Sequence, residues 1–314
     1  MDAVTIASVI AAAAPLVYAT IGETIAEKAG VVNLSLDGTL LIAAMVSFAA
    51  AVTTGSVIVG FAAAAGVAML VAFVIAFASI ELRLNQIAVG FVLFLLMRDL
   101  SSLLGQSFVR RPGPSVPPLE IAGLSDIPWL GTVLFTHNLS VYGSIVTVFV
   151  AYWFIYRTKA GLELQAVGER PEAAFARGIS VERRRYVYAL VGGALVGIGG
   201  AAFSLDVKFG WSEGHVTNFG WIALAIVIFG GWHPARVALG CYLFGALQVL
   251  ALKLQPTFPS FTQVLGILPF PLMILTLVVI NRPAFRALGD RMRFMRRFLT
   301  SEAPAGLGTN FEQG

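Results

Sequence analysis

The stretch Gly22–Met45, GETIAEKAGVVNLSLDGTLLIAAM, carries charged and polar residues into the edge of an apolar run. Its ionisable and amide side chains are Glu23, Glu27, Lys28, Asn33 and Asp37. Charged groups are expensive beside hydrocarbon unless water or a partner is near. We therefore expect Glu23, Glu27 and Lys28 to lie in a water-accessible turn between two membrane spans. Asn33 and Asp37 are then expected at the mouth of the second span.

The rest of the 314-residue chain is equally apolar, with 58% hydrophobic residues, 12% charged residues and a mean hydropathy of +0.84. Soluble domains carry roughly 25% charged residues. The apolar runs are continuous and most approach the ~20 residues that cross a bilayer, which predicts an all-α polytopic membrane protein rather than a barrel. The nine predicted spans are 3–20, 36–53, 57–80, 84–104, 139–157, 186–206, 219–231, 235–252 and 261–281. The run 219–231 is short, which indicates a half-helix or a broken helix.

Lysine and arginine predict the orientation of these spans. Seven of them lie in the loop 157–185 and six in the tail after residue 281, so both segments are expected in the cytoplasm. An even number of spans separates them, and counting back places the N-terminus outside. We expect one transmembrane domain over 1–300, with its main cytoplasmic loop at 158–185. The polar tail 301–314 is expected to be disordered.

A weak internal repeat has an offset of about 180 residues. GVVNLSLDGTLLIAAMVSF, from Gly30, resembles GHVTNFGWIALAIVIF, from Gly214. In the predicted topology the two copies run in opposite directions. Inverted repeats are a recurrent transporter architecture, with the pathway at the interface between the halves.

The loop 158–185 contains GERPEAAFARGI, which predicts a short helix at about Pro171–Arg177. Proline suits the first helical position, Glu172 lies in the first turn, and Gly178 can end the helix in a left-handed conformation. Such a helix, held outside the bilayer, can dock on a soluble partner. The alternative is an ordinary positively charged loop. The mixture of acidic with basic residues favours a docking surface.

Two further patterns were weighed against simpler interpretations. YALVGGALVGIGGAA, from Tyr188, has small residues four apart, which predicts close helix packing rather than a nucleotide-binding loop. Polar residues at the edges of spans are expected either to cap helices and bond between them or to line a translocation path; Asp37 could cap the span that it begins. The candidates for the path are Asn33, Ser35, Asp37, Asn85 and Gln86.

No catalytic arrangement can be argued from the residues. His137, His215 and His233 lie on separate loops, the single Cys241 excludes a disulfide framework, and no metal site is expected. The basic tail RALGDRMRFMRRFL, from Arg286, is a candidate amphipathic helix at the membrane surface. Nucleic-acid binding is not expected of a chain with so many spans.

Three stretches together resemble the permease subunits of bacterial ABC importers for nucleosides and simple sugars, within the wider group of ribose and branched-chain amino-acid permeases. They are GETIAEKAGVVNLSLDG, AVGERPEAAFARGI and GWIALAIVIFGGWHPARVALGCYLFG, and they span nearly the whole chain. Asp37 stands where the nucleoside branch usually has Glu, which keeps the acid on a shorter stem.

The resemblance implies a type II importer fold with two inverted sets of helices, located in the bacterial cytoplasmic (inner) membrane. It also implies partners: an ABC ATPase subunit that handles ATP, a second permease subunit that makes a heterodimer, and an extracytoplasmic substrate-binding protein. This chain has no Walker motif and is expected to bind no cofactor itself. The coupling helix of the family falls on Gly168, Glu169, Pro171, Ala173, Ala174, Gly178 and Ile179.

The resulting hypothesis is a translocation subunit for an uncharged nucleoside or simple sugar, powered by ATP hydrolysis on a partner. The alternatives are a secondary transporter driven by an ion gradient and a non-transporting membrane scaffold. A secondary transporter is expected to hold buried ionisable groups in its spans. A scaffold does not explain a docking helix combined with an inverted repeat.

Overall fold

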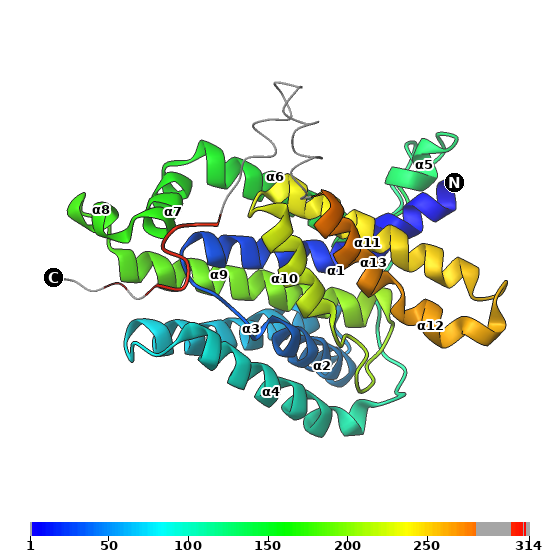
Figure 1. The fold of residues 1–314 in the computed structure, drawn as a ribbon. Coiled ribbons are helices and arrows are strands. Elements are labelled where there is room, and N and C mark those ends of the chain that lie inside the picture. Colours follow the sequence, from blue (N-terminus) through cyan, green and yellow to red (C-terminus); the bar gives the residue numbers. More distant parts are fainter. Residues whose placement is uncertain (1, 281–302, 310, 312–314) are drawn as a thin grey trace.

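The computed structural model describes residues 2–280, 303–309 and 311, and this part of the chain is helical with one isolated β-bridge between Pro118 and Asn138 (Figure 1). The helices are α1 Ala3–Lys28, α2 Leu36–Thr54, α3 Val57–Ile80, α4 Gln86–Gly105, α5 Leu130–Leu134, α6 Leu139–Arg157, α7 Lys159–Glu169, α8 Pro171–Ala176, α9 Val181–Ala202, α10 Phe219–Gly230, α11 Pro234–Leu254, α12 Thr262–Ile267 and α13 Pro269–Ile280. Short turns η1 (Gln106–Phe108) and η3 (Pro259–Phe261) follow α4 and precede α12, and a π-helical turn η2 (Phe203–Val207) continues α9.

Seven helices in the described residues are long and apolar enough to cross a membrane: α1, α2, α3, α4, α6, α9 and α11. An eighth crossing is formed if the pair Pro259–Ile267 and Pro269–Val279, bent by 48°, counts as one broken span. The predicted span 219–231 is α10, a helix of 12 residues, too short to cross on its own. A polytopic helical membrane protein is therefore confirmed, with a span count close to the predicted nine.

Local sequence signals begin several of these helices. Side-chain oxygens of Asn85, Asn138 and Thr158 accept hydrogen bonds from backbone N–H groups in the first turns of α4, α6 and α7. These caps satisfy N–H groups that have no partner within the helix. At the end of α2, Gly55 takes a left-handed conformation with φ of 71°. The helix boundaries are thus largely set by short-range chemistry.

Helix α9 packs against both α1 and α3, and small residues bring these backbones together. A Cβ added to Gly197 of α9 would lie 2.3 Å from the carbonyl oxygen of Ala64 in α3. A Cβ on Gly192 would lie 2.5 Å from the carbonyl oxygen of Gly22 in α1. These contacts confirm that the small-residue spacing in α9 serves helix packing.

Helices α2 and α10 start at the same place and run in opposite directions. A Cβ on Gly220 would lie 2.2 Å from the Cα atom of Asp37, so the two first turns touch. The far end of α10 lies near α1, where Trp232 bonds to Glu27, whereas the far end of α2 packs at Phe48 against Gly113 of the long connection. The opposite directions are those that the inverted repeat predicts.

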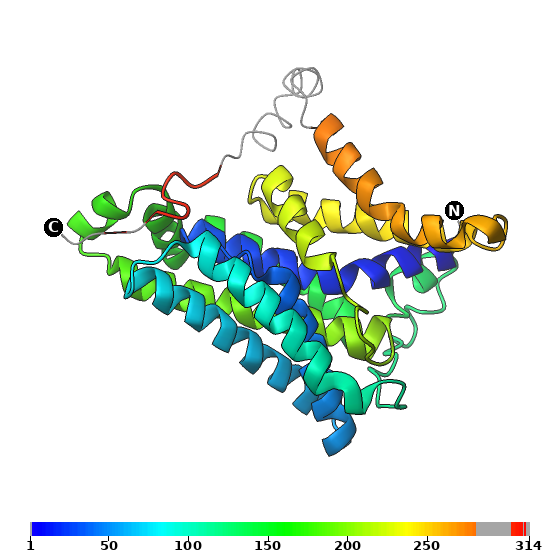
Figure 2. The same cartoon turned by 60° about the horizontal axis from the view of Figure 1, so that its bottom comes forward.

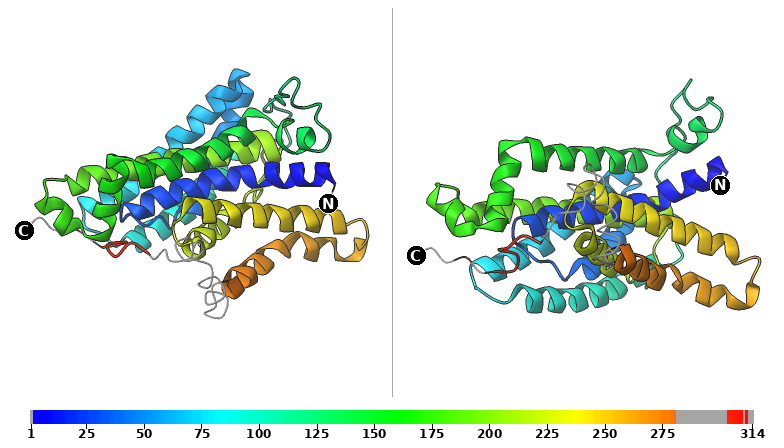
Figure 3. Two further views of the ribbon diagram at one scale, coloured as in Figure 1. Left: turned by 90° about the horizontal axis from the view of Figure 1, so that it is seen from above. Right: turned by 45° about the horizontal axis from the view of Figure 1, so that its top comes forward.

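The elements outside the spans gather at two opposite ends (Figure 3). One end holds the N-terminus, α5 and α12, and the other holds α7, α8 and the described C-terminal residues. The connection between α4 and α6 pairs with the end of α9, where Val116 N–H donates to Leu205 O at 3.0 Å.

The prediction that Glu23, Glu27 and Lys28 lie in a water-accessible turn is wrong. Helix α1 continues to Lys28, and these side chains are only 1%, 3% and 7% exposed. Asn33, the partner of Glu23, lies in the same stretch, but Trp232, the partner of Glu27, comes from a distant segment that the sequence alone does not reveal. The polar residues of the opening stretch are therefore part of the protein interior.

The tail also differs from its expectation where it is described. Residues 303–309 pack between the end of α1 and α7, and Gly306 N–H donates to Gly168 O at 2.8 Å while Gly308 N–H donates to Gly30 O at 3.1 Å. Backbone bonds to two separate elements hold this segment in place, so disorder over all of 301–314 is corrected for residues 303–309. The predicted amphipathic helix from Arg286 lies outside the described residues.

Candidate functional site

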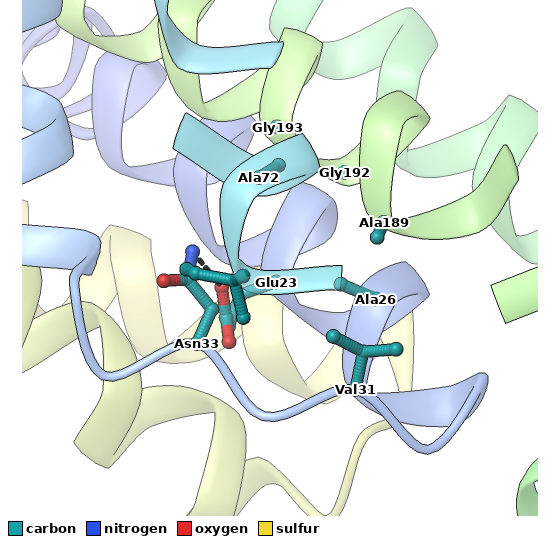
Figure 4. A pocket seen from close by; sticks show the side chains of 9 residues that line it. Glu23, Ala26, Val31, Asn33, Ala72, Ala189, Gly192 and Gly193 are labelled. Atoms are coloured by element: carbon teal, nitrogen blue, oxygen red, sulfur yellow. Dashed lines mark hydrogen bonds between the residues drawn. The ribbon is translucent and has the colours of Figure 1, made fainter. Parts of the chain in front are cut away.

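Two glutamates begin a buried polar network near the C-terminal end of α1. Glu23 Oε2 accepts from Asn33 Nδ2 at 3.4 Å (Figure 4), and Glu27 Oε2 accepts from the indole Nε1 of Trp232. The other oxygen of Glu23 is buried and has no hydrogen-bond partner among the described residues. It borders a cavity of about 10 Å³ that Asn33 also lines, room for about one water molecule.

Asn33 and Ser35 order the extended segment that leads into α2. Asn33 Oδ1 accepts from the backbone N–H of Ser35 at 3.0 Å and from its hydroxyl at 2.6 Å. The Ser35 hydroxyl is also 2.9 Å from that of Thr39, one turn into the helix. This local ring of hydrogen bonds replaces the backbone pairing that an extended segment lacks.

Asp37 caps a helix other than the one predicted. It lies inside α2, and its Oδ1 accepts from the backbone N–H of Gly220 at 2.8 Å, in the first turn of α10. Asn218, the residue just before α10, has φ of 71° and provides no side-chain cap. A carboxylate at a helix N-terminus satisfies a free donor and complements the helix dipole. Asp37 therefore joins the two members of the repeat.

Asn85 caps the start of α4, and Gln86 joins it to the extended segment that leads into α2. Asn85 Oδ1 accepts from the N–H groups of Ile87 and Ala88, while Gln86 Oε1 accepts from Val32 N–H at 2.8 Å. Asn85 is exposed and Gln86 is 3% exposed.

Of the five residues predicted for the path, Asn33, Ser35, Asp37 and Gln86 form a buried frame around the start of α2, and Asn85 caps a neighbouring helix. Each has a hydrogen bond that explains its presence. Contact with a substrate stays a prediction for all five.

The predicted cytoplasmic helix is present as α8. It runs from Pro171 to Ala176, with proline at its first position and Glu172 in its first turn, and Gly178 follows with φ of 81°. Ile179 N–H donates to Ala174 O at 3.1 Å, which closes the C-terminal turn. Pro171 and Ala174 face inward, whereas Ala173 is exposed.

The last two residues of α7, Gly168 and Glu169, anchor α8 to the body of the protein. A Cβ on Gly168 would lie 2.0 Å from Lys28 O, so α7 crosses the end of α1 with no room for a side chain. The carboxylate of Glu169 accepts from Ala305 N–H at 3.3 Å. The residues predicted for coupling therefore form helix α8, the turn that closes it, and the end of α7 that attaches it to α1 and to the C-terminal segment.

Sequence reasoning missed the contribution of the C-terminal segment to this end. Arg185 Nη1 donates to Thr309 O at 2.8 Å, and the ring of Phe311 lies 5.6 Å from that of Phe175 in α8. A segment rich in glycine and alanine, APAGLGTNF, gives no periodic signal that would indicate such contacts.

His233, between α10 and α11, follows Trp232 and so lies beside the buried polar network of Glu23 and Glu27. Its ring stacks on Tyr156, with centroids 5.4 Å apart. Burial, together with the charges of Arg236 and Lys28, lowers the pKa of His233 from 6.5 to about 4. The imidazole is therefore neutral at physiological pH.

A second buried polar pair was also missed, at the opposite end of the molecule. Asp206 lies in the π-helical turn η2 and accepts from Asn138 Nδ2, while Tyr18 donates to Ser140 O at 2.8 Å. A π-helical turn has no reliable sequence signal, although such turns are frequent at functional sites. In the part of the chain that the structure describes, no group of three or more His, Cys, Asp or Glu residues is placed to hold a metal ion.

Comparison with known proteins agrees with this architecture. A putative glucose ABC transporter permease protein of Haloferax volcanii is 37% identical over 248 residues, 78% of this chain and 75% of its own length. The guanosine ABC transporter permease protein NupQ of Bacillus subtilis is 30% identical over 303 residues, 88% of this chain and 93% of its own. The nucleoside ABC transporter permease protein NupC of Lactococcus lactis is 30% identical over 259 residues, 79% and 82% of the two chains.

Two of these organisms also have a second named permease with a weaker likeness. NupB of L. lactis and NupP of B. subtilis match 36% and 37% of this chain. No solved structure matches the chain. The family model described as "Branched-chain amino acid transport system / permease component" matches residues 5–277. The chain, a multi-pass membrane protein, therefore belongs to this permease family.

Proposed function

We propose that this protein is the translocation subunit of an ABC importer for a nucleoside or a simple sugar. The observation that carries the proposal is α8, a short capped helix outside the spans, in a chain whose relatives are named as guanosine, nucleoside and glucose permeases. ATP hydrolysis takes place on a separate ATPase subunit. The exposed side of α8 docks on that subunit, and its movement changes the access of the path.

The proposal includes two more partners and an orientation. A second permease completes the path as a heterodimer, in line with the paired permeases of B. subtilis and L. lactis. An extracytoplasmic binding protein delivers the substrate. The end with α7 and α8 faces the cytoplasm, because the loop 157–185 carries seven Lys and Arg residues. The N-terminus then lies outside the cytoplasmic membrane.

A secondary transporter remains the competing function, and one observation favours it. Glu23 and Glu27 are buried in α1, where ion-coupled carriers hold titratable groups. Their hydrogen bonds to Asn33 and Trp232 give them a structural role, so the ABC importer is preferred.

The test is uptake of radiolabelled guanosine and glucose into proteoliposomes that contain both permeases and the ATPase, with the binding protein added. We expect uptake that needs ATP and is insensitive to ionophores. Uptake driven by a proton or sodium gradient without ATP would contradict the proposal.

A variant of α8 sharpens this test. Ala173 is exposed, so Ala173→Arg should leave the spans folded but obstruct docking. We expect copurification of the ATPase and ATP-dependent uptake to fall at least about tenfold, which corresponds to about 1.4 kcal/mol of lost association. The matched control, Ala173→Ser, keeps a small side chain and should behave like the unchanged protein. Equal copurification by the two variants would remove α8 from the docking surface.

A further inference from the structure

A cavity of about 230 Å³ lies at the end of the molecule opposite α8. Its wall is formed by the end of α9 with η2, the start of α10, the C-terminal half of α11 and the bent pair α12–α13. Figure 2 shows α12 and α13 in orange, beyond α11. The proposed orientation places this cavity on the extracytoplasmic side, where a substrate arrives.

Two glutamine amides line the cavity, and both lack hydrogen bonds to the described residues. Gln248 and Gln255 border it from α11 and the residue that follows that helix. They are seven residues apart, which places them on one face of the helix, roughly 10 Å apart along its axis. An amide inside a span is retained only where it faces protein or water. Each amide is a donor and an acceptor, so the pair can bond to hydroxyl groups.

A single cation lies at the edge of the cavity. Lys208 follows η2 and has no ion pair with the described residues. Lys208 is exposed, and desolvation by its surroundings lowers the pKa of its ammonium group. One ammonium beside two neutral amides suits a polar neutral compound better than a multiply charged one.

The apolar part of the wall combines two phenylalanine rings with aliphatic side chains of α1, α11 and η2. Phe203 and Phe219 border the cavity, with ring centroids 4.6 Å apart, and Phe270 meets Phe219 at 5.7 Å. Binding sites for small molecules typically combine such an apolar wall with a few placed polar groups. The C–H face of a sugar ring is an apolar surface that can pack against such a wall.

We propose that this cavity binds a polyhydroxylated sugar ring, either of a free sugar or of the ribose of a nucleoside, with Gln248 and Gln255 bonding to its hydroxyl groups. The site rests on the proposed function and extends it, because it assigns substrate contact to residues outside the buried frame of Asn33, Ser35 and Asp37.

The experiment measures equilibrium binding of radiolabelled guanosine and radiolabelled glucose to the purified, ATP-free complex of the permeases and ATPase, without its binding protein. The variants are Gln248→Leu and Gln255→Leu. The matched control is Gln106→Leu, because Gln106 is an exposed glutamine in η1, on an element that does not line the cavity. The two probes separate a free sugar from a nucleoside.

We expect saturable binding of one probe, about fivefold weaker in each cavity variant, the factor that a lost hydrogen bond of roughly 1 kcal/mol gives. Gln106→Leu should bind like the unchanged protein. Unchanged affinity in both cavity variants, or no saturable binding of either probe to the unchanged complex, overturns the site.

If Gln248→Leu fails to assemble, Gln248→Asn keeps an amide on a shorter stem and should also weaken binding, because the amide no longer reaches the ligand. Failure of the site is distinguishable from failure of the function. The function depends on ATP-driven uptake with the binding protein present, whereas the site depends on binding without it.

Discussion

The molecule combines a half packed by glycine with a half packed by phenylalanine. In the first, Gly193 and Gly197 of α9 bring backbones to α3 at distances that leave no room for a methyl group. In the second, Phe219, Phe244 and Phe270 meet edge to face at 5.4–5.8 Å, and a cavity of about 230 Å³ remains beside them. The cavity found among the glycine and alanine residues is only about 10 Å³, whereas the one beside the phenylalanine rings is far larger. The comparison separates a fixed frame from a region that has room for a ligand.

The largest effect is expected from a methyl group added to the glycine-packed half. In Gly197→Ala the new Cβ would meet the Ala64 carbonyl oxygen at 2.3 Å, so α9 and α3 must separate. We expect about 1–3 kcal/mol of destabilisation, as for overpacked cores. Thermal unfolding of the purified protein measures it.

The matched control is Gly66→Ala, in α3, the helix that Gly197 contacts. No atom lies within 4 Å of its added Cβ. We expect Gly66→Ala to be neutral or slightly stabilising, since alanine favours a helix over glycine. Similar unfolding temperatures for the two variants would contradict the account of the glycine-packed half.

A smaller effect is expected at Asp37, where α2 of the frame meets α10 of the aromatic half. Asp37→Ala removes the acceptor for Gly220 N–H, and loss of a cap costs roughly 0.5–2 kcal/mol. Asp37→Asn retains an oxygen at the same position and should lose less. Thermal unfolding, read with ATP-dependent uptake, ranks the two variants. If Asp37→Ala left both readouts unchanged, the cap would not matter.

The last effect is expected from pH and concerns His233, in the turn between α10 and α11. The folded pKa of about 4 lies below the ordinary value of 6.5, so between these values the unfolded chain binds more protons. Stability should therefore fall as pH falls from 6.5 towards 4. Tyr152, Tyr156, Lys28 and Arg236 surround the ring.

The measurement is the unfolding temperature at a series of pH values between 7 and 4. His233→Gln cannot take up a proton, so its unfolding temperature should fall less steeply over this range. His215, whose pKa is also lowered by burial, is left in place in both proteins. Equal slopes would show that His233 does not contribute.

Local features were predictable, and distant ones were not. Helix α8 was predictable from Pro171 and Gly178, which lie seven positions apart, because each residue acts through the backbone conformation of its own position. The small-residue spacing of α9 likewise carried its packing role. The partner of Glu23, Asn33, lies in the same stretch of sequence, but the partner of Glu27, Trp232, is 205 residues away, so no window of sequence could reveal it.

The candidate path shows the same limit. Its five residues were selected because polar groups at the edge of a span need an explanation, and the structure supplies a hydrogen bond for each. The helix that Asp37 caps could not be predicted, because α10 comes from a different part of the chain. Gln248 is a polar residue near the end of the predicted span 235–252, but only the arrangement of α10 to α13 shows that it borders a cavity.

The contact between Asp37 and Gly220 also has a consequence in time. The two residues are 183 positions apart, and synthesis at roughly 5–20 residues per second separates them by about 9–37 seconds. During that interval α2 has entered the membrane with a carboxylate that lacks its final partner. The packing of α2 against α10 therefore forms only after α10 has been made.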